Sequence, residues 1–323
     1  KTPPKPPFAV TVGIIGHRPN RLPAGAAEAV ERQIDAILAG LRQSAEAARQ
    51  HYAAFFADGP GTLTMISAMA EGADRMAARS ALRNGYALDA ALPFPAADYE
   101  NDFAEQSSRE EFARLLGQAG RALVLPGDYS AEPRDYEPVG RVILDNADVI
   151  LAVWDGGDSA GKGGTTHLLE QAVSRGLPII HVDARDENPP RLLWTDLPDF
   201  PATRATLRTV PSATPAEAMD EVVDRIVRPP PAEEERARLT RFLNGRWRRF
   251  NWRVEVPLIL MTLGLRRFKR SDFAHPSPDR AAADLLRLVG GAEGAGAGSD
   301  GARRIADAYG AADAHAVRDA QIF

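Results

Sequence analysis

Short apolar runs rich in β-branched residues recur along the first two thirds of the chain, and segments with helical periodicity separate them. The clearest run lies within residues 148–156 and is continuous, which is typical of a strand buried on both faces of a parallel sheet. Further strands are predicted at residues 8–15, 62–67, 86–92, 121–125 and 177–182. Helices are predicted between them at residues 23–50, 68–84, 98–116, 138–146 and 165–173. Because strands alternate with helices, we expect an α/β fold: a Rossmann-like open parallel sheet with helices on both faces.

A proline run divides the chain in two. Arg228-Pro229-Pro230-Pro231 is a stiff linker. We therefore expect an α/β domain at residues 1–228, a linker at 229–231 and a mainly helical extension at 232–323. Within the extension, helices are predicted at 232–245 and 302–323, and a glycine- and alanine-rich loop at 290–301.

The extension contains an apolar run at residues 256–265, with tryptophan and arginine in its flanks. A helix needs about 20 apolar residues to cross a bilayer, so this run is too short to do so. Two interpretations stay open. The flanks suit a membrane interface, which would make residues 232–323 a juxtamembrane region, and the run could equally pack its apolar face against the sheet domain.

Composition narrows the class of protein. The 323 residues carry a formal net charge of −5, which disfavours nucleic acid as the main partner because phosphate neutralisation needs a basic surface. There is no cysteine, which excludes disulfides and thiolate chemistry. The proline-rich lead at residues 1–7 is unlike a secretion signal, so we expect a cytoplasmic location, at the inner face of the membrane if the extension is juxtamembrane. The chain starts without Met and stops at Phe323, so we expect it to be an excerpt of a longer protein.

Polar loops follow the carboxyl ends of the predicted strands. Open α/β sheets bind ligands at that edge, near the point where the strand order reverses, so several loops are expected to meet in one crevice. The loops are Gly16-His17-Arg18, Glu71-Gly72-Ala73-Asp74, Pro93-Phe94-Pro95, Asp155-Gly156 and the residue Asp183.

The loop after the clearest strand ends in Gly163-Gly164-Thr165-Thr166, where a helix is predicted to begin. Glycines let the backbone approach a ligand, and the first turn of a helix offers free N–H groups and a positive dipole end to a phosphate. The alternative is an ordinary helix cap with a glycine hinge. The loop is not a Walker A motif, since Lys162 precedes the glycine pair.

Five side chains are candidates for contact with the ligand. Arg18 could pair with a phosphate, and His17 could bind a ribose or cap a turn. Glu71, Asp74 and Asp155 could hold ribose hydroxyls or act as a general base; Asp74 could equally cap its helix, and Asp155 could shape its own turn. A dinucleotide fingerprint is not met, because the third glycine is missing after Gly13 and Gly16, and no spacing matches a metal site.

Taken in order, these motifs resemble the SLOG superfamily, the Rossmann-like group that includes the LOG phosphoribohydrolases, the DNA-processing protein DprA and the YpsA-type proteins. The resemblance covers about residues 8–185 and rests on Gly16-His17-Arg18, residues 70–74, residues 92–95, Trp154-Asp155-Gly156 and Gly163-Gly164-Thr165. It implies a nucleotide-type ligand, with no other cofactor, in the crevice formed by Gly16–Arg18, Glu71–Asp74 and Gly163–Thr166. SLOG domains often pair, which implies a homo-oligomer.

The chain departs from the LOG pattern in two respects that concern catalysis. LOG enzymes carry an Arg-Lys pair upstream, and Val139-Gly140-Arg141 offers none here. LOG enzymes carry a catalytic glutamate two or three residues after the glycine-rich motif, whereas His167 and Leu168 occupy those positions here and Glu170 comes two residues too late. The tail resembles, more loosely, bacterial proteins that fuse a SLOG domain to transmembrane helices of the SLATT kind.

These observations predict a nucleotide-binding sensor coupled to a C-terminal membrane effector in bacterial signalling or defence. The first alternative is a nucleoside 5′-monophosphate N-glycosidase, with Glu71 and Asp155 as catalytic carboxylates. The second is a purely structural interaction module with a blocked crevice. The expected ligand-binding residues are Gly16, His17, Arg18, Glu71, Gly72, Asp74, Asp155, Gly156, Gly163, Gly164, Thr165 and Thr166.

Overall fold

The computed structural model of the chain describes residues 3–23, 25–130, 136–157, 164–196, 205–245, 255–265, 267, 269, 277–290 and 300–320. The chain divides into two compact units. One comprises Pro7–Tyr52 and Gly59–Arg228, and the other comprises Lys1–Pro6, Ala53–Asp58 and Pro229–Phe323. The sequence assigns all residues up to 228 to the first domain. Two short segments of that range, Lys1–Pro6 and Ala53–Asp58, group with the second unit instead.

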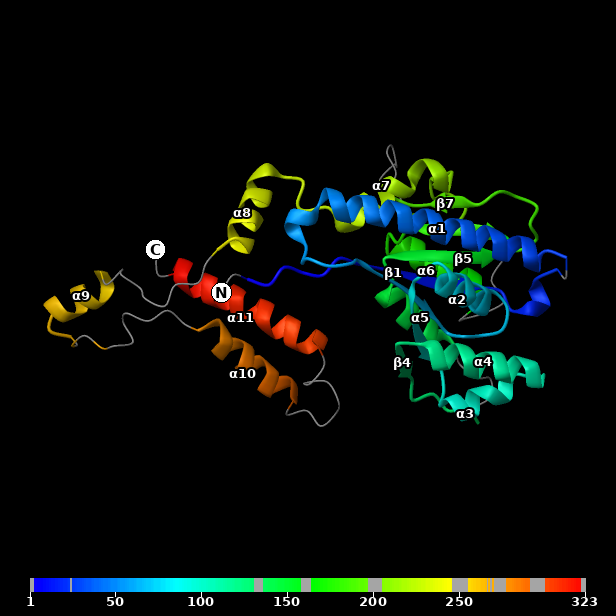
Figure 1. Ribbon diagram of the computed structural model, residues 1–323, viewed down its shortest axis with the longest axis horizontal. Coiled ribbons are helices and arrows are strands. Elements are labelled where there is room, and N and C mark those ends of the chain that lie inside the picture. Colours follow the sequence, from blue (N-terminus) through cyan, green and yellow to red (C-terminus); the bar gives the residue numbers. More distant parts are fainter. Residues whose placement is uncertain are drawn as a thin grey trace. The chain divides into compact units, whose positions relative to one another are not determined.

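The first unit is built on one eight-stranded sheet with the order β4-β3-β2-β1-β5-β6-β7-β8. Its strands β1, β4, β5 and β7 are labelled in Figure 1. The strands from β4 to β6 run parallel, while β7 and β8 pair antiparallel at one edge. Their bounds are β1 Ala9–Gly16, β2 Thr62–Ser67, β3 Ala87–Leu92, β4 Arg121–Val124, β5 Val149–Trp154, β6 Ile179–Asp183, β7 Arg191–Leu193 and β8 Ser212–Ala213. The predicted α/β class and open, mainly parallel sheet are confirmed.

Helices cover both faces of this sheet. Side chains alternate between the faces along a strand. A Cβ added at Gly13 of β1 would meet Ile143 and Ala147 around α5 (Glu137–Asn146), whereas one added at Gly16 would overlap Ala73 of α2 (Ala73–Arg83). Accordingly α5 packs with α6 (Thr165–Ser174) on one face, and α1 (Ala27–His51) packs with α2 and α7 (Pro215–Val227) on the other.

Two predicted helices differ in extent from the observed ones. The helix predicted at 68–84 begins only at Ala73, because Met69 and Gly72 have positive φ angles of 59° and 90° that break the helical path. The helix predicted at 98–116 is two helices, α3 (Ala96–Tyr99) and α4 (Gln106–Gln118), with a 3-10 turn at Glu100–Asp102 between them. Strands β7 and β8 were not predicted, since three and two residues are too few for a visible pattern.

The second unit contains the helices α8 (Glu233–Leu243), α9 (Glu255–Thr262), α10 (Pro278–Gly290) and α11 (Asp300–Ala320). α10, which was not predicted, packs against α11, and Gly310 permits the close approach because a Cβ there would overlap the carbonyl of Pro278. Most of the predicted loop at 290–301 lies outside the described residues. Among the helices that are described, none has both the length and the apolar character that a membrane span requires.

Candidate functional site

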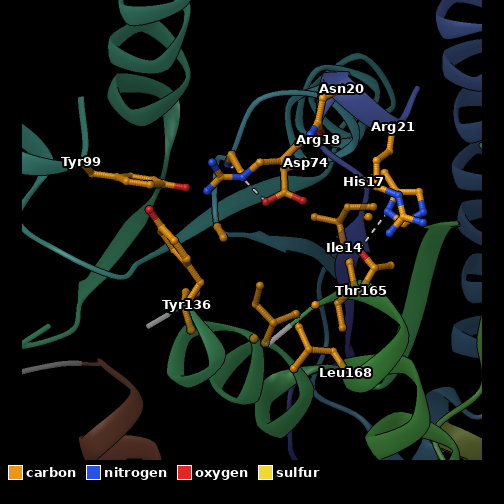
Figure 2. A pocket seen from close by; sticks show the side chains of 18 residues that line it. Ile14, His17, Arg18, Asn20, Arg21, Asp74, Tyr99, Tyr136, Thr165 and Leu168 are labelled. Carbon is orange, nitrogen blue, oxygen red and sulfur yellow. Dashed lines mark hydrogen bonds between the residues drawn. The ribbon is translucent and has the colours of Figure 1, made fainter. Parts of the chain in front are cut away.

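A cavity of about 400 Å³ opens at the carboxyl ends of the central strands. From β1 the chain continues into β2, β3 and β4 on one side, and it then returns to form β5 and β6 on the other side of β1. The strand order therefore reverses at β1, and sheets of this kind bind ligands at such a switch point. Figure 2 shows charged and aromatic side chains at one end of the cavity and His17 and Thr165 at the other. The lining residues are Ile14, Ile15, Gly16, His17, Arg18, Asn20, Arg21, Ala68, Ala70, Asp74, Tyr99, Tyr136, Val139, Gly140, Ile143, Gly164, Thr165 and Leu168.

Two glycines bring the loop after β1 against the start of α2. The Ala73 N–H donates to the His17 carbonyl over 3.1 Å, so the loop after β1 lies against the first turn of α2 and accepts one of its free N–H groups. Gly72 has a φ of +90°, and a Cβ there would lie 2.6 Å from the same carbonyl oxygen. Gly16 and Gly72 were both expected to contact the ligand; the structure gives each a packing role, and only Gly16 also lines the cavity.

His17 is 3% exposed and is held at both ring nitrogens. Its Nε2 lies 2.9 Å from Oδ1 of Asp155 and 3.2 Å from the Asp155 backbone nitrogen, and its Nδ1 lies 3.2 Å from Oγ1 of Thr165. The Asp155 N–H is directed at Nε2 as a donor, and only an unprotonated Nε2 could accept it. The contact with the carboxylate is shorter and has a charged acceptor, so it outweighs the N–H contact, and we assign the proton to Nε2. Nδ1 is then an acceptor on the cavity side. Burial lowers the pKa of His17 below its ordinary value, against the opposing effect of Asp155, so the ring is neutral near pH 7.

Asp155 is ionised at neutral pH and holds the His17 ring in place. Although partial burial raises its pKa, hydrogen bonds from His17 and the Gly157 N–H, together with Arg21, bring the pKa to about 2. Nη2 of Arg21 lies 3.0 Å and Nη2 of Arg185 3.7 Å from its Oδ2. Asp155 is not among the residues that line the cavity, and its carboxylate contacts the His17 ring; the base role considered for it stays a prediction.

Asp74 is the buried carboxyl at the other end of the cavity. It lies in the first turn of α2, is 7% exposed, and its Oδ2 accepts the Ala70 N–H over 3.3 Å. Burial raises its pKa to about 7, against the opposing effects of that N–H and of Arg18. Asp74 can therefore hold or release a proton at neutral pH, which is the property of a general acid or base.

Arg18 and two tyrosines complete that end of the cavity. The Arg18 guanidinium lies over the Tyr136 ring, 4.9 Å from its centroid, and its Nη2 lies 3.9 Å from Oδ2 of Asp102. The Tyr136 hydroxyl donates to the same Asp102 oxygen over 2.6 Å. Tyr99 is buried, which raises its pKa well above the ordinary range and keeps the phenol protonated. Neither tyrosine was predicted to belong to the site.

The remaining predicted residues fall in three places. The Glu71 carboxylate accepts a hydrogen bond from Ser108 and faces a neighbouring groove between α2 and α4, outside this cavity. Thr166 accepts from Nε1 of Trp154 over 3.0 Å and donates to the Gly157 carbonyl over 2.9 Å, so it fastens the loop after β5. Gly156 forms the turn of that loop with a φ of +75°. Gly163 lies outside the described residues, while Gly164 and Thr165 line the cavity.

The amino end of α6 contributes a positive dipole end to the cavity wall. The first hydrogen bond within this helix runs from the Leu168 N–H to the Gly164 carbonyl, so the N–H groups of the preceding three residues have no acceptor within the helix. Together with Arg18 they make the cavity attractive to an anion. In the part of the chain that the structure describes, no group of three or more His, Asp or Glu side chains is arranged to hold a metal ion.

Comparison with known proteins gives little further information. No family model matches the chain, and no curated protein matches it. DNA processing protein A (DprA) from Streptococcus pneumoniae is similar over 56% of this chain and 54% of its own, with 16% identity and a TM-score of 0.34. The protein TM1055 is similar over 53% of this chain and 72% of its own, with 14% identity and a TM-score of 0.31. The chain thus spans about half the length of DprA.

Proposed function

We propose that the cavity binds a nucleotide or a nucleotide-derived small molecule. The observation that carries this proposal is the position of the cavity at the strand-order reversal, with Arg18 and the amino end of α6 in its wall. A volume of about 400 Å³ is within the range of small-molecule sites. Phosphate oxygens would bind Arg18 and the α6 amides, and ribose or base would contact Asp74.

The aromatic side chains support a ligand with a flat ring. The Tyr136 ring already lies under the Arg18 guanidinium, and Tyr99 brings a protonated phenol to the same end. Stacking of this kind is tolerant of which base is bound, since every base has a π face. The buried Asp74 adds a group that can donate or accept a hydrogen bond at neutral pH.

Calorimetric titration with AMP, ADP-ribose and cyclic dinucleotides tests the proposal. We expect at least one of them to bind, and Arg18→Ala to weaken that binding by roughly tenfold or more, as expected for a lost charge-assisted contact. Arg175→Ala is the matched control, because Arg175 pairs with Asp145 beyond the carboxyl end of α6. No binding of any probe to folded protein would overturn the proposal.

Asp74 favours a second candidate, an N-glycosidase that acts on a nucleoside monophosphate. In that reaction the bond between C1′ and the base breaks, and Asp74 gives its proton to the departing base. Water then supplies the hydroxyl at C1′, and its remaining proton returns to Asp74. Release of adenine from AMP, followed chromatographically, would be lost in Asp74→Asn. Glu71→Gln is the discriminating variant, because Glu71 was a catalytic candidate from the sequence and faces the neighbouring groove. Equal loss in both variants, or no release by the wild type, would count against this candidate.

The sensor role, the membrane effector and the homodimer stay predictions. A sensor requires that ligand binding changes the C-terminal helices. Hydrogen exchange of residues 278–320 with and without the ligand that binds would test this coupling. Unchanged exchange at a saturating ligand concentration would argue for a binding domain that acts by itself.

A further inference from the structure

We infer that Thr165, His17 and Asp155 form a nucleophile, base and orienting carboxylate that can take up an acyl group from an ester. This activity goes beyond ligand binding and does not rest on the nucleotide proposal. It rests on the order of contacts at the His17 end of the cavity: Thr165 Oγ1 to His17 Nδ1 over 3.2 Å, and His17 Nε2 to Asp155 Oδ1 over 2.9 Å.

The contacts match the geometry that activates a hydroxyl. A nucleophile must lie within hydrogen-bond reach of a base, and the base must be oriented by a third group on its other nitrogen. With the proton on Nε2 facing Asp155, Nδ1 of His17 is free of a proton and points at Thr165 (Figure 2). Arg21 and the Gly157 N–H hold the Asp155 carboxylate, so the base is fixed by groups on three different segments.

The three residues lie at the ends of regular elements. His17 follows the central strand β1, Asp155 follows the adjacent strand β5, and Thr165 is the first residue of α6. At that position the Thr165 hydroxyl experiences the positive end of the helix dipole, which favours a developing alkoxide. The next amides of the first turn have no acceptor within the helix and can stabilise an oxyanion beside Thr165.

The wall next to Thr165 suits an acyl chain. Apolar side chains from three elements line it: Ile14 of β1, Val139 and Ile143 of α5, and Leu168 of α6. Leu168 comes close to α5 because Gly140 has no side chain, and a Cβ there would overlap it. An ester with an aliphatic acyl group on this wall would place its carbonyl at the amino end of α6.

The chemistry balances with water as the only co-reactant. Thr165 Oγ1 attacks the ester carbonyl as its proton passes to His17 Nδ1, and the new C–O bond forms. The bond to the alcohol then breaks, and His17 returns the proton to the departing oxygen. Water, deprotonated by the same nitrogen, hydrolyses the acyl-threonine to a carboxylic acid and frees Thr165.

A pre-steady-state assay with p-nitrophenyl butyrate tests the inference on the full chain. We expect a burst of p-nitrophenolate of about one equivalent per chain and one butyryl group on the peptide that contains Thr165, found by mass spectrometry after acid quench. Thr165→Ala should remove both, and Thr165→Ser should keep them. Ser174→Ala is the matched hydroxyl control, because Ser174 is exposed at the far end of the same helix.

The other two residues have distinguishable effects. His17→Ala should slow acylation by roughly 10² to 10⁴-fold, the range of general base catalysis. Asp155→Asn should shift the pH–rate profile, because the ring would lose the carboxylate that fixes its tautomer; urea unfolding checks that each variant is folded. A folded wild type without a burst, or a burst and adduct that persist in Thr165→Ala, would overturn the inference. The probe is uncharged and contains no nucleotide, so neither outcome decides the nucleotide proposal.

Discussion

Replacing Asp74 with asparagine removes a carboxyl that folding makes harder to ionise. The side chain is 7% exposed, and burial raises its pKa to about 7. In the unfolded chain an aspartate has a pKa of about 3.9. Between these values the folded protein keeps a proton that the unfolded chain has lost. The free energy of unfolding must therefore fall as the pH rises through this window, by about 1.4 kcal/mol per pH unit and on the order of 4 kcal/mol in all.

Urea unfolding of the wild type and of Asp74→Asn, measured at intervals from pH 4 to pH 8, isolates this contribution. Asparagine keeps the carbonyl oxygen that accepts the Ala70 N–H and cannot ionise. The difference in free energy between variant and wild type should therefore change in favour of the variant by several kcal/mol between pH 4 and pH 8. Protonation of buried histidines such as His17 destabilises the fold as the pH falls. This contribution is the same in both proteins, so it cancels in the difference between their free energies of unfolding.

Ser174→Ala is the control, since Ser174 is exposed and not titratable, and its replacement should leave the pH dependence of the wild type unchanged. Parallel curves for the wild type and Asp74→Asn would refute the reasoning. They would mean that Asp74 ionises as easily in the folded state as in the unfolded chain, and it would then be no proton donor at neutral pH.

Three further variants test packing and surface. Gly16→Ala should lower the free energy of unfolding in urea by about 1–3 kcal/mol, because the added Cβ would overlap Ala73. Gly25→Ala is the control and should change it little, because there is open space around Gly25. Equal effects of the two substitutions would contradict the packing argument. Arg75→Ala should cost about 3–5 kcal/mol by the same measurement, since the guanidinium is buried over an aromatic ring and bonded to backbone carbonyls, and a loss below 1 kcal/mol would contradict that account. The apolar face of α9 is exposed, with Ile259 at 54%, so vesicles with anionic lipid should sediment the chain and Ile259→Asp should reduce this; equal sedimentation would argue against a membrane-facing helix.

The sheet was predictable because buried parallel strands leave a plain signal. β5 is apolar from Val149 to Trp154, and every predicted strand of the parallel part exists with ends shifted by at most two residues. The place of the cavity followed from the same pattern, since loops after neighbouring parallel strands must meet. His17 and Thr165 could be named on that basis.

The chemistry within the cavity was not predictable in the same way. Glu71 and Asp74 stand three residues apart, and Asp74 alone of the two lines the cavity, after a turn in which Met69 and Gly72 have positive φ angles that no sequence pattern indicated. The His17–Asp155 pair joins positions 138 residues apart, and its effect on both pKa values depends on burial. Tyr99 and Tyr136 come seven and twelve residues after the ends of β3 and β4, too far along the chain for the strand-end pattern to indicate them.

Burial gives the two ends of the cavity opposite roles in proton transfer, and this has a consequence for ligand affinity. Near pH 7 the His17 ring is neutral and accepts, while Asp74 still holds part of its proton, so the fixed charges in the cavity wall are those of Arg18 and Arg21. When Asp74 ionises, its negative charge opposes an anionic ligand. The affinity for ADP-ribose, whose pyrophosphate does not titrate in this range, should fall by about fivefold between pH 6 and pH 8, which corresponds to about 1 kcal/mol of unfavourable interaction. Asp74→Asn should remove this dependence while retaining binding. A pH dependence that persists in the variant would assign it to another group and would separate Asp74 from the ligand.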